Sequence, residues 1–169
     1  QVQITAAYFD QRPQDYLFTS TVLSYVPASN RWMNLGKLPF PATVGAAAAV
    51  NTAGLFTLVN GELKPGLRSP AVQAGSFDGA EMHWRAMPDL VGMEAFVRQE
   101  GLAGAAAGYL GDHLVVAGGT NFPGSWAAFD AGSNGAHRGL TKTWHDTIYA
   151  LTDGQWSVVG KLPQAVANS

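Results

Sequence analysis

The hydrophobic residues of this chain fall in short stretches separated by polar turns rich in glycine, asparagine and proline, a pattern that indicates β-strands. Two pairs of such stretches occur, and each pair ends in a glycine-containing dipeptide. They are residues 44–50 with 55–60, closed by Asn60-Gly61, and residues 102–108 with 113–119, closed by Gly118-Gly119. We therefore expect a strand unit that occurs at least twice.

Aromatic residues mark the same repeat. An aromatic side chain is followed by a polar turn, then by a Trp seven positions later, and then by an apolar-Pro step. The copies are Tyr25 with Trp32, Phe77 with Trp84 and Tyr149 with Trp156, followed by Pro39, Pro88 and Pro163. Tandem Gly, Tyr and Trp at a period near 50 residues are the signature of kelch repeats. The alternative is a generic β-sandwich, but repeated spacings of this kind favour an all-β, kelch-type β-propeller.

The repeat also divides the chain. We expect the outer part of one blade in residues 1–40, whole blades in 41–88 and 101–163, and the start of another in 164–169. Propellers typically close with four to eight blades, so about three blades do not make a ring. The remaining blades, on this protein or on a second chain, are therefore expected as partners. The longer intervals in the second copy are assigned to loops on one face, which would be the binding face.

Composition narrows the possible partners. Charged residues make up 13% of the chain, against about 25% in typical domains, and the formal net charge is −2. We expect no nucleic acid and no membrane surface as partner, because no basic excess is present to neutralise phosphates. The chain has no cysteine, which excludes disulfides and thiolate ligands. Its histidines show no metal-ligand spacing, so we predict neither metal nor cofactor.

The segment from Asn60 to Arg68 carries the densest chemistry. It contains the carboxylate of Glu62 and the cations Lys64 and Arg68. A carboxylate near a propeller axis can act as a general base, and an Arg presents a planar fork that suits a carboxylate ligand. We predict Glu62 and Arg68 as catalytic and Asn60 and Lys64 as substrate-binding. The alternative is that Glu62 and Arg68 pair with each other and hold the turn.

The second long loop, residues 120–145, adds two candidates for substrate binding. Asn121 offers a carboxamide, and His137 could contact a ligand or carry a proton. A loop histidine is more often hydrogen-bonded or solvated, and this alternative stays open.

Four stretches resemble the bacterial N-acetylneuraminate (sialic acid) mutarotases, also called epimerases. They are residues 8–18, 60–68, 118–124 and 136–140, and the stretch 60–68 is the most specific of them. The resemblance implies a six-bladed propeller that interconverts the α and β anomers of a sugar acid without a cofactor, in the periplasm or otherwise exported. It also implies that Glu62 is the acid/base residue and that Arg68 binds the substrate carboxylate.

The chain departs from the family pattern at two places. Residues 125–129 lack an Arg-Glu pair, and Arg138 stands where an acidic residue is usual. Both departures bear on sugar specificity. A non-catalytic kelch module that binds a protein or a glycan through the same face is the alternative function, and it predicts that Glu62 is dispensable.

Overall fold

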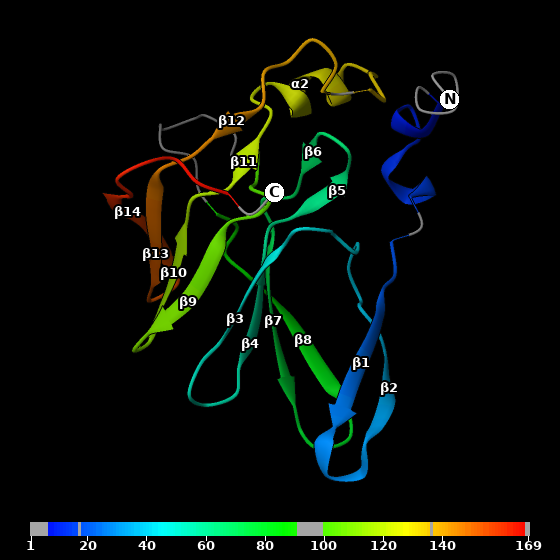
Figure 1. The fold of residues 1–169 in the computed structure, drawn as a ribbon, viewed down its shortest axis with the longest axis vertical. Coiled ribbons are helices and arrows are strands. Elements are labelled where there is room, and N and C mark those ends of the chain that lie inside the picture. The colour runs from blue at the N-terminus through cyan, green and yellow to red at the C-terminus, as the bar shows by residue number, and fades with distance from the viewer. Residues whose placement is uncertain (1–6, 17, 91–99, 136, 168–169) are drawn as a thin grey trace.

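The computed structural model describes residues 7–16, 18–90, 100–135 and 137–167. Two antiparallel four-stranded sheets form most of the structure (Figure 1). The first contains, in spatial order, β3 (Ala47–Val50), β4 (Phe56–Val59), β7 (Val72–Phe77) and β8 (Met82–Met87). The second contains β9 (Ala106–Leu110), β10 (His113–Ala117), β13 (Thr147–Thr152) and β14 (Gln155–Lys161). In each sheet the strand order follows the chain order, as in a propeller blade.

A third, two-stranded sheet precedes these blades. It pairs β1 (Thr21–Val26) with β2 (Arg31–Lys37) across the short helix η2 (Pro27–Ser29). Tyr25 lies directly opposite Trp32 in this pair, with ring centroids 5.1 Å apart. The spacing of seven that marked the repeat in the sequence therefore spans a hairpin.

The hydrophobic core lies between the two four-stranded sheets. Buried and more exposed positions alternate along β3, β4 and β10, as expected for strands with one face toward the core. The buried cluster comprises Ala47, Ala49, Val59, Val72, Leu90, Leu102, Leu114, Val116, Tyr149 and Leu151. Alanines on β3 let β9 of the next blade approach closely, and Gly104 N–H donates to the Gly45 carbonyl at 2.8 Å.

The glycine dipeptides connect one blade to the next. Gly61 N–H donates to the Leu102 carbonyl at 2.9 Å, and Gly119 N–H donates to the Val166 carbonyl at 2.8 Å. Both glycines have positive φ, at 98° and 96°, a conformation that favours glycine. The dipeptides therefore occupy equivalent places in the two blades.

Two bridges follow these glycines and start the long connections. Val44 pairs with Glu62, and Ala103 pairs with Thr120. In each blade, the inner segment, which leads into β3 or β9, thus pairs with the residue that comes directly after the glycine. Glu62 in one blade and Thr120 in the other are consequently equivalent positions.

The long connections gather at one end of the blades, which we call the upper face (Figure 1). It carries η1 (Pro13–Asp15), β5 (Glu62–Lys64), β6 (Leu67–Arg68), β11 (Thr120–Asn121), α2 (Ser125–Asp130) and β12 (Thr143–Trp144). Tight hairpin turns lie at the opposite end. The sequence predicted loops here, whereas the structure forms two short two-stranded sheets, β5–β6 and β11–β12, and a helix. The inner strands also begin later than expected, at Ala47 and Ala106.

Within the described ranges, no helix is both long enough and apolar enough to cross a membrane.

Candidate functional site

The hairpin β5–β6 brings Glu62 and Arg68 together. The two residues are cross-strand partners, and Gly66, with φ at 85°, turns the chain between them. The Arg68 guanidinium forms an ion pair with the Glu62 carboxylate. Side-chain exposure is 5% for Arg68 and 19% for Glu62. The pairing that the sequence left as an alternative is therefore present, and it leaves the carboxylate the more accessible partner.

The guanidinium of Arg68 is held from the second blade. Its Nε donates to the Thr120 carbonyl at 3.4 Å, and it lies 5.5 Å from the centroid of the Phe122 ring. Burial lowers the pKa of Arg68 to about 10. The group therefore stays protonated at neutral pH, and a buried cation of this kind can bind a carboxylate ligand strongly.

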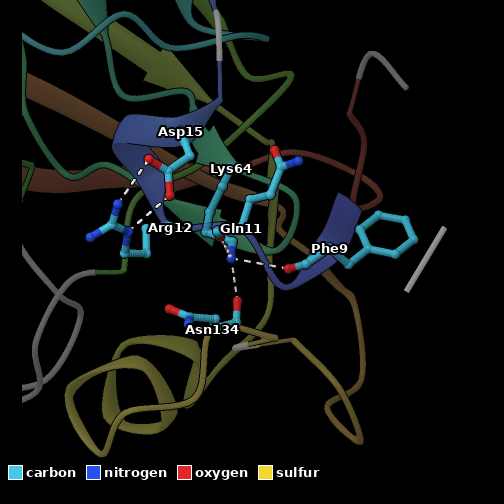
Figure 2. A network of polar contacts seen from close by, with 6 residues as sticks. All are labelled: Phe9, Gln11, Arg12, Asp15, Lys64 and Asn134. Carbon is cyan, nitrogen blue, oxygen red and sulfur yellow. Dashed lines mark hydrogen bonds and ion pairs between the residues drawn. The ribbon is translucent and has the colours of Figure 1, made fainter. Parts of the chain in front are cut away.

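Lys64, for which the sequence predicted a substrate contact, lies buried among backbone carbonyls in the structure. Its side chain is fully buried, and its ammonium donates to three backbone carbonyls, those of Phe9, Gln11 and Asn134 (Figure 2). An ammonium has three donors, so these bonds use all of them. Lys64 contacts protein backbone in this structure and presents no free donor to a ligand.

His137 packs against the turn of the hairpin. Its ring lies between Phe9 and Phe122, with centroid distances of 5.3 and 5.5 Å. A methyl group placed on Gly66 would come within 2.2 Å of the His137 side chain, which shows how closely the turn meets the ring. Phe122 therefore contacts both His137 and the Arg68 guanidinium.

The environment of His137 favours its neutral form. Burial is the main cause that lowers its pKa, and the positive charges of Lys64, Arg138 and Arg68 add to it. Its Nδ1 atom is buried, and a backbone hydrogen bond with Pro65 opposes the lowering of the pKa. A neutral imidazole next to the hairpin could accept or pass on a proton, as the sequence suggested.

The two asparagines predicted to bind substrate make other contacts. The Asn121 Oδ1 atom forms a hydrogen bond with His145 Nε2 at 2.8 Å. Asn60 is buried and lines a cavity of about 200 Å³ whose lining includes neither Glu62 nor Arg68. The structure therefore brings Glu62, Arg68 and His137 together, and it places Asn60 outside this group.

Two residues that the sequence analysis missed support the site. Glu100 accepts hydrogen bonds from Gly124 N–H at 2.7 Å and from the amide and hydroxyl of Ser125 at 3.1 and 2.9 Å. This fixes the start of α2, and Trp126 on that helix donates from its indole to the Arg68 carbonyl at 2.8 Å. Trp126 lies between the stretches 118–124 and 136–140 and belongs to neither, and Glu100 is 24 residues away from Gly124, its nearest partner in the chain, so neither gives a local signal.

Among the described residues, no group of three His, Asp or Glu side chains is placed to hold a metal ion. The chemistry on offer is that of one carboxylate, one buried guanidinium and one neutral imidazole. Such a set can bind an acid and transfer protons.

The repeated blades and the ion pair on the upper face define this chain as part of a kelch-type β-propeller with a candidate acid–base site. A family model described as N-acetylneuraminate epimerase matches residues 1–169. The chain belongs to the N-acetylneuraminate epimerase family.

Individual relatives agree with this assignment. The chain is 51% identical over 164 residues to an N-acetylneuraminate epimerase of Yersinia enterocolitica, a match that covers 97% of this chain and 42% of the relative. It is 47% identical to one of Haemophilus influenzae, covering 97% of this chain and 43% of the relative. The solved structure titled "Structure of YjhT" superposes with a TM-score of 0.88 at 36% identity, covering 98% of this chain and 46% of that one. The chain thus spans less than half the length of these relatives.

Proposed function

We propose that this chain contributes the acid–base part of the active site of a sialic acid mutarotase, which interconverts the α and β anomers of N-acetylneuraminate. The observation that carries the proposal is the ion pair between Arg68 and Glu62 on the upper face. The remaining blades, on the same protein or on a second chain, would complete the site.

Binding starts from this ion pair. The substrate has a carboxylate at the anomeric carbon, and Arg68 is a protonated guanidinium that also contacts the Thr120 carbonyl and the Phe122 ring. The substrate carboxylate would take the place of Glu62 as the partner of Arg68. Charge neutrality at the guanidinium is kept, because one carboxylate replaces another. The exchange releases Glu62 beside the anomeric centre.

The chemical step needs a proton to leave and a proton to enter. Glu62 would accept the proton of the anomeric hydroxyl while solvent water donates a proton to the ring oxygen, which opens the pyranose to a ketone. Rotation about the bond to the carbonyl carbon exposes its other face. The ring hydroxyl then attacks, the two protons return, and the other anomer forms. No electrons are exchanged with another molecule, and general acid–base help of about 10²- to 10⁴-fold is typical for such a step.

The test is anomer exchange of N-acetylneuraminate, followed by NMR magnetisation transfer in the closed propeller that contains this chain. We expect the intact protein to accelerate exchange and Glu62→Gln to lose at least about 100-fold of that acceleration. Glu81→Gln is the matched control, because Glu81 is exposed in the β7–β8 turn at the other end of the same blade.

Two results would argue against the proposal. If the intact protein does not accelerate exchange, this reaction is not its function. If Glu62→Gln keeps full activity while binding of the sugar is retained, the carboxylate is dispensable, as a non-catalytic binding module predicts.

A further inference from the structure

The most unusual buried group outside the ion pair is the ammonium of Lys64. A lysine is almost never fully buried unless its charge is compensated, and Lys64 has 0% exposure. Its compensation comes from three backbone carbonyls and from the ring of Tyr16, whose centroid lies 5.5 Å from Nζ. Burial lowers the pKa of Lys64, and the charge of Asp10 opposes that shift.

The three carbonyls come from two segments that are far from Lys64 in the chain. Phe9 and Gln11 belong to the N-terminal segment, and Asn134 follows α2 (Figure 2). One ammonium therefore ties three parts of the upper face to a single point. The exposed ion pair between Arg138 and Asp10, at 3.1 Å, joins the same two segments at the surface.

The position of Lys64 in the hairpin gives this contact a consequence for the site. Lys64 is on the same three-residue strand as Glu62, and it pairs with Leu67, the neighbour of Arg68. The hairpin is too short to be stable by itself. Its place on the upper face therefore depends on what holds its side chains.

We propose that Lys64 is a positioning residue, whose buried ammonium clamps the β5–β6 hairpin between the N-terminal segment and the segment after α2, and thereby fixes Glu62 and Arg68 relative to the substrate. The inference rests on the proposed mutarotase function for its catalytic part. The clamp itself is a statement about the fold and can be tested without activity.

The experiment compares Lys64→Met, Lys64→Arg and Lys161→Met in the closed propeller. Met has a similar length without the charge, and Arg keeps the charge but presents a planar fork in place of three donors on one atom. Lys161 on β14 pairs with Asp146 at the surface, at 3.2 Å, and serves as the charge control. Anomer exchange gives kcat and KM, and hydrogen exchange reports protection of the hairpin and of residues 7–16.

We expect Lys64→Met to lower kcat about 10- to 100-fold, the size of effect that a displacement of about 1 Å produces, with a smaller change in KM. Amide protection in the hairpin and in residues 7–16 should fall together. Lys64→Arg should fold and recover part of both. NMR titration should show a higher His137 pKa in Lys64→Met than in Lys64→Arg, because the charge of Lys64 acts on His137 beside those of Arg138 and Arg68. Lys161→Met should match the intact protein throughout.

The outcomes separate the clamp from the reaction. If the intact protein does not accelerate exchange but Lys64→Met loses protection at both segments, the reaction fails and the clamp stands. If the intact protein is active and Lys64→Met keeps its kcat and protection, the clamp is overturned. A rise in KM with unchanged kcat would overturn it in favour of direct substrate contact. If Lys64→Met does not fold, Lys64→Arg decides, since wild-type kcat and protection in that variant would contradict the clamp.

Discussion

Two of the long connections on the upper face, which we call excursions, begin in the same way and end differently. The hairpin β5–β6 and the longer excursion through β11, α2 and β12 each follow a glycine with positive φ and each start with a bridge to an inner segment. The first residue after the glycine is Glu62 in one blade and Thr120 in the other. The same backbone position thus carries a charge paired with Arg68 or a hydroxyl that donates to the Ala103 carbonyl at 3.4 Å.

This difference shows that one backbone arrangement, present in both blades, carries different side-chain chemistry in each blade. The long excursion covers the short one, since Trp126 donates to the Arg68 carbonyl and the Asn134 carbonyl accepts from Lys64. One blade carries the ionic groups, and the next blade supplies their surroundings. The predictions below test how far the equivalence of the two blades extends.

The largest effect is expected where a methyl group replaces a glycine hydrogen. Gly61 and Gly119 have nearly the same φ, so the backbone strain of an alanine is the same. A Cβ would lie 2.6 Å from Thr43 Oγ1 at Gly61, but 3.0 Å from its nearest neighbour, the Leu102 Cβ, at Gly119. We expect Gly61→Ala to destabilise the propeller by about 3–4 kcal/mol and Gly119→Ala by about 2 kcal/mol. Urea unfolding of both variants measures this, and equal losses would mean that packing at the two sites is equivalent after all.

The next effect is the coupling between Glu62 and Arg68. A double-mutant cycle with Glu62→Gln and Arg68→Met should give about 1–3 kcal/mol in unfolding free energy, reduced from the value for a fully buried pair because Glu62 is partly exposed. The matched cycle replaces Glu62→Gln by Thr120→Ala. Its coupling should be close to zero, because Arg68 contacts the Thr120 backbone carbonyl. Similar coupling in both cycles would show that the two positions are not chemically distinct.

A smaller effect on stability is expected when the pH is lowered. Burial lowers the pKa of His145, which shares a hydrogen bond with Asn121, and the charge of Asp146 opposes the shift. A histidine whose pKa is lowered by folding contributes stability that is present above its unfolded pKa of about 6.5 and is lost as the pH falls through the folded pKa. Between pH 7 and pH 5 we expect the longer excursion, through β11, α2 and β12, to lose up to about 1 kcal/mol of protection against hydrogen exchange. His145→Gln should remove this pH dependence, and its persistence in that variant would point to another group.

The smallest effect lies at the opposite end of the blades. Near the β7–β8 turn, a hydrogen bond that the His83 ring donates to the Asp78 carboxylate at 2.8 Å raises the pKa of His83. Asp78→Asn should lower that pKa toward about 6.5, as NMR titration of the ring would show. Both side chains are exposed, so the unfolding midpoint should not change. A clear loss of stability would mean that the hairpin turns contribute more to the fold than the comparison of the upper-face excursions implies.

The fold could be predicted because its signals are local. Tyr25 and Trp32 are seven residues apart and face each other across one hairpin. Exact register was harder to predict. In the last blade only two residues separate the paired Thr152 and Gln155, so the same spacing places Trp156 opposite Leu151. Strand identity follows from short-range pattern, whereas register also depends on turn length and on irregularities that the pattern does not show.

The candidate site was partly predictable for the same reason. Glu62 and Arg68 flank one turn, so their pairing could be foreseen. The role of Lys64 could not, because its acceptors are backbone carbonyls between 53 and 70 residues away. Every residue has a carbonyl, so no side-chain pattern marks those that converge. Glu100 and Ser125 meet across a shorter gap, of 25 residues, which is still too long for a local signal.

The contacts from Gly61 to Leu102 and from Gly119 to Val166 join backbone amide to backbone carbonyl. Neither side of these junctions depends on which side chain the acceptor residue carries. In evolutionary terms, a blade can be duplicated and its copy can acquire a new excursion while the joint to its neighbour stays valid. The geometry of the propeller and the chemistry of its upper-face side chains can then change independently in evolution.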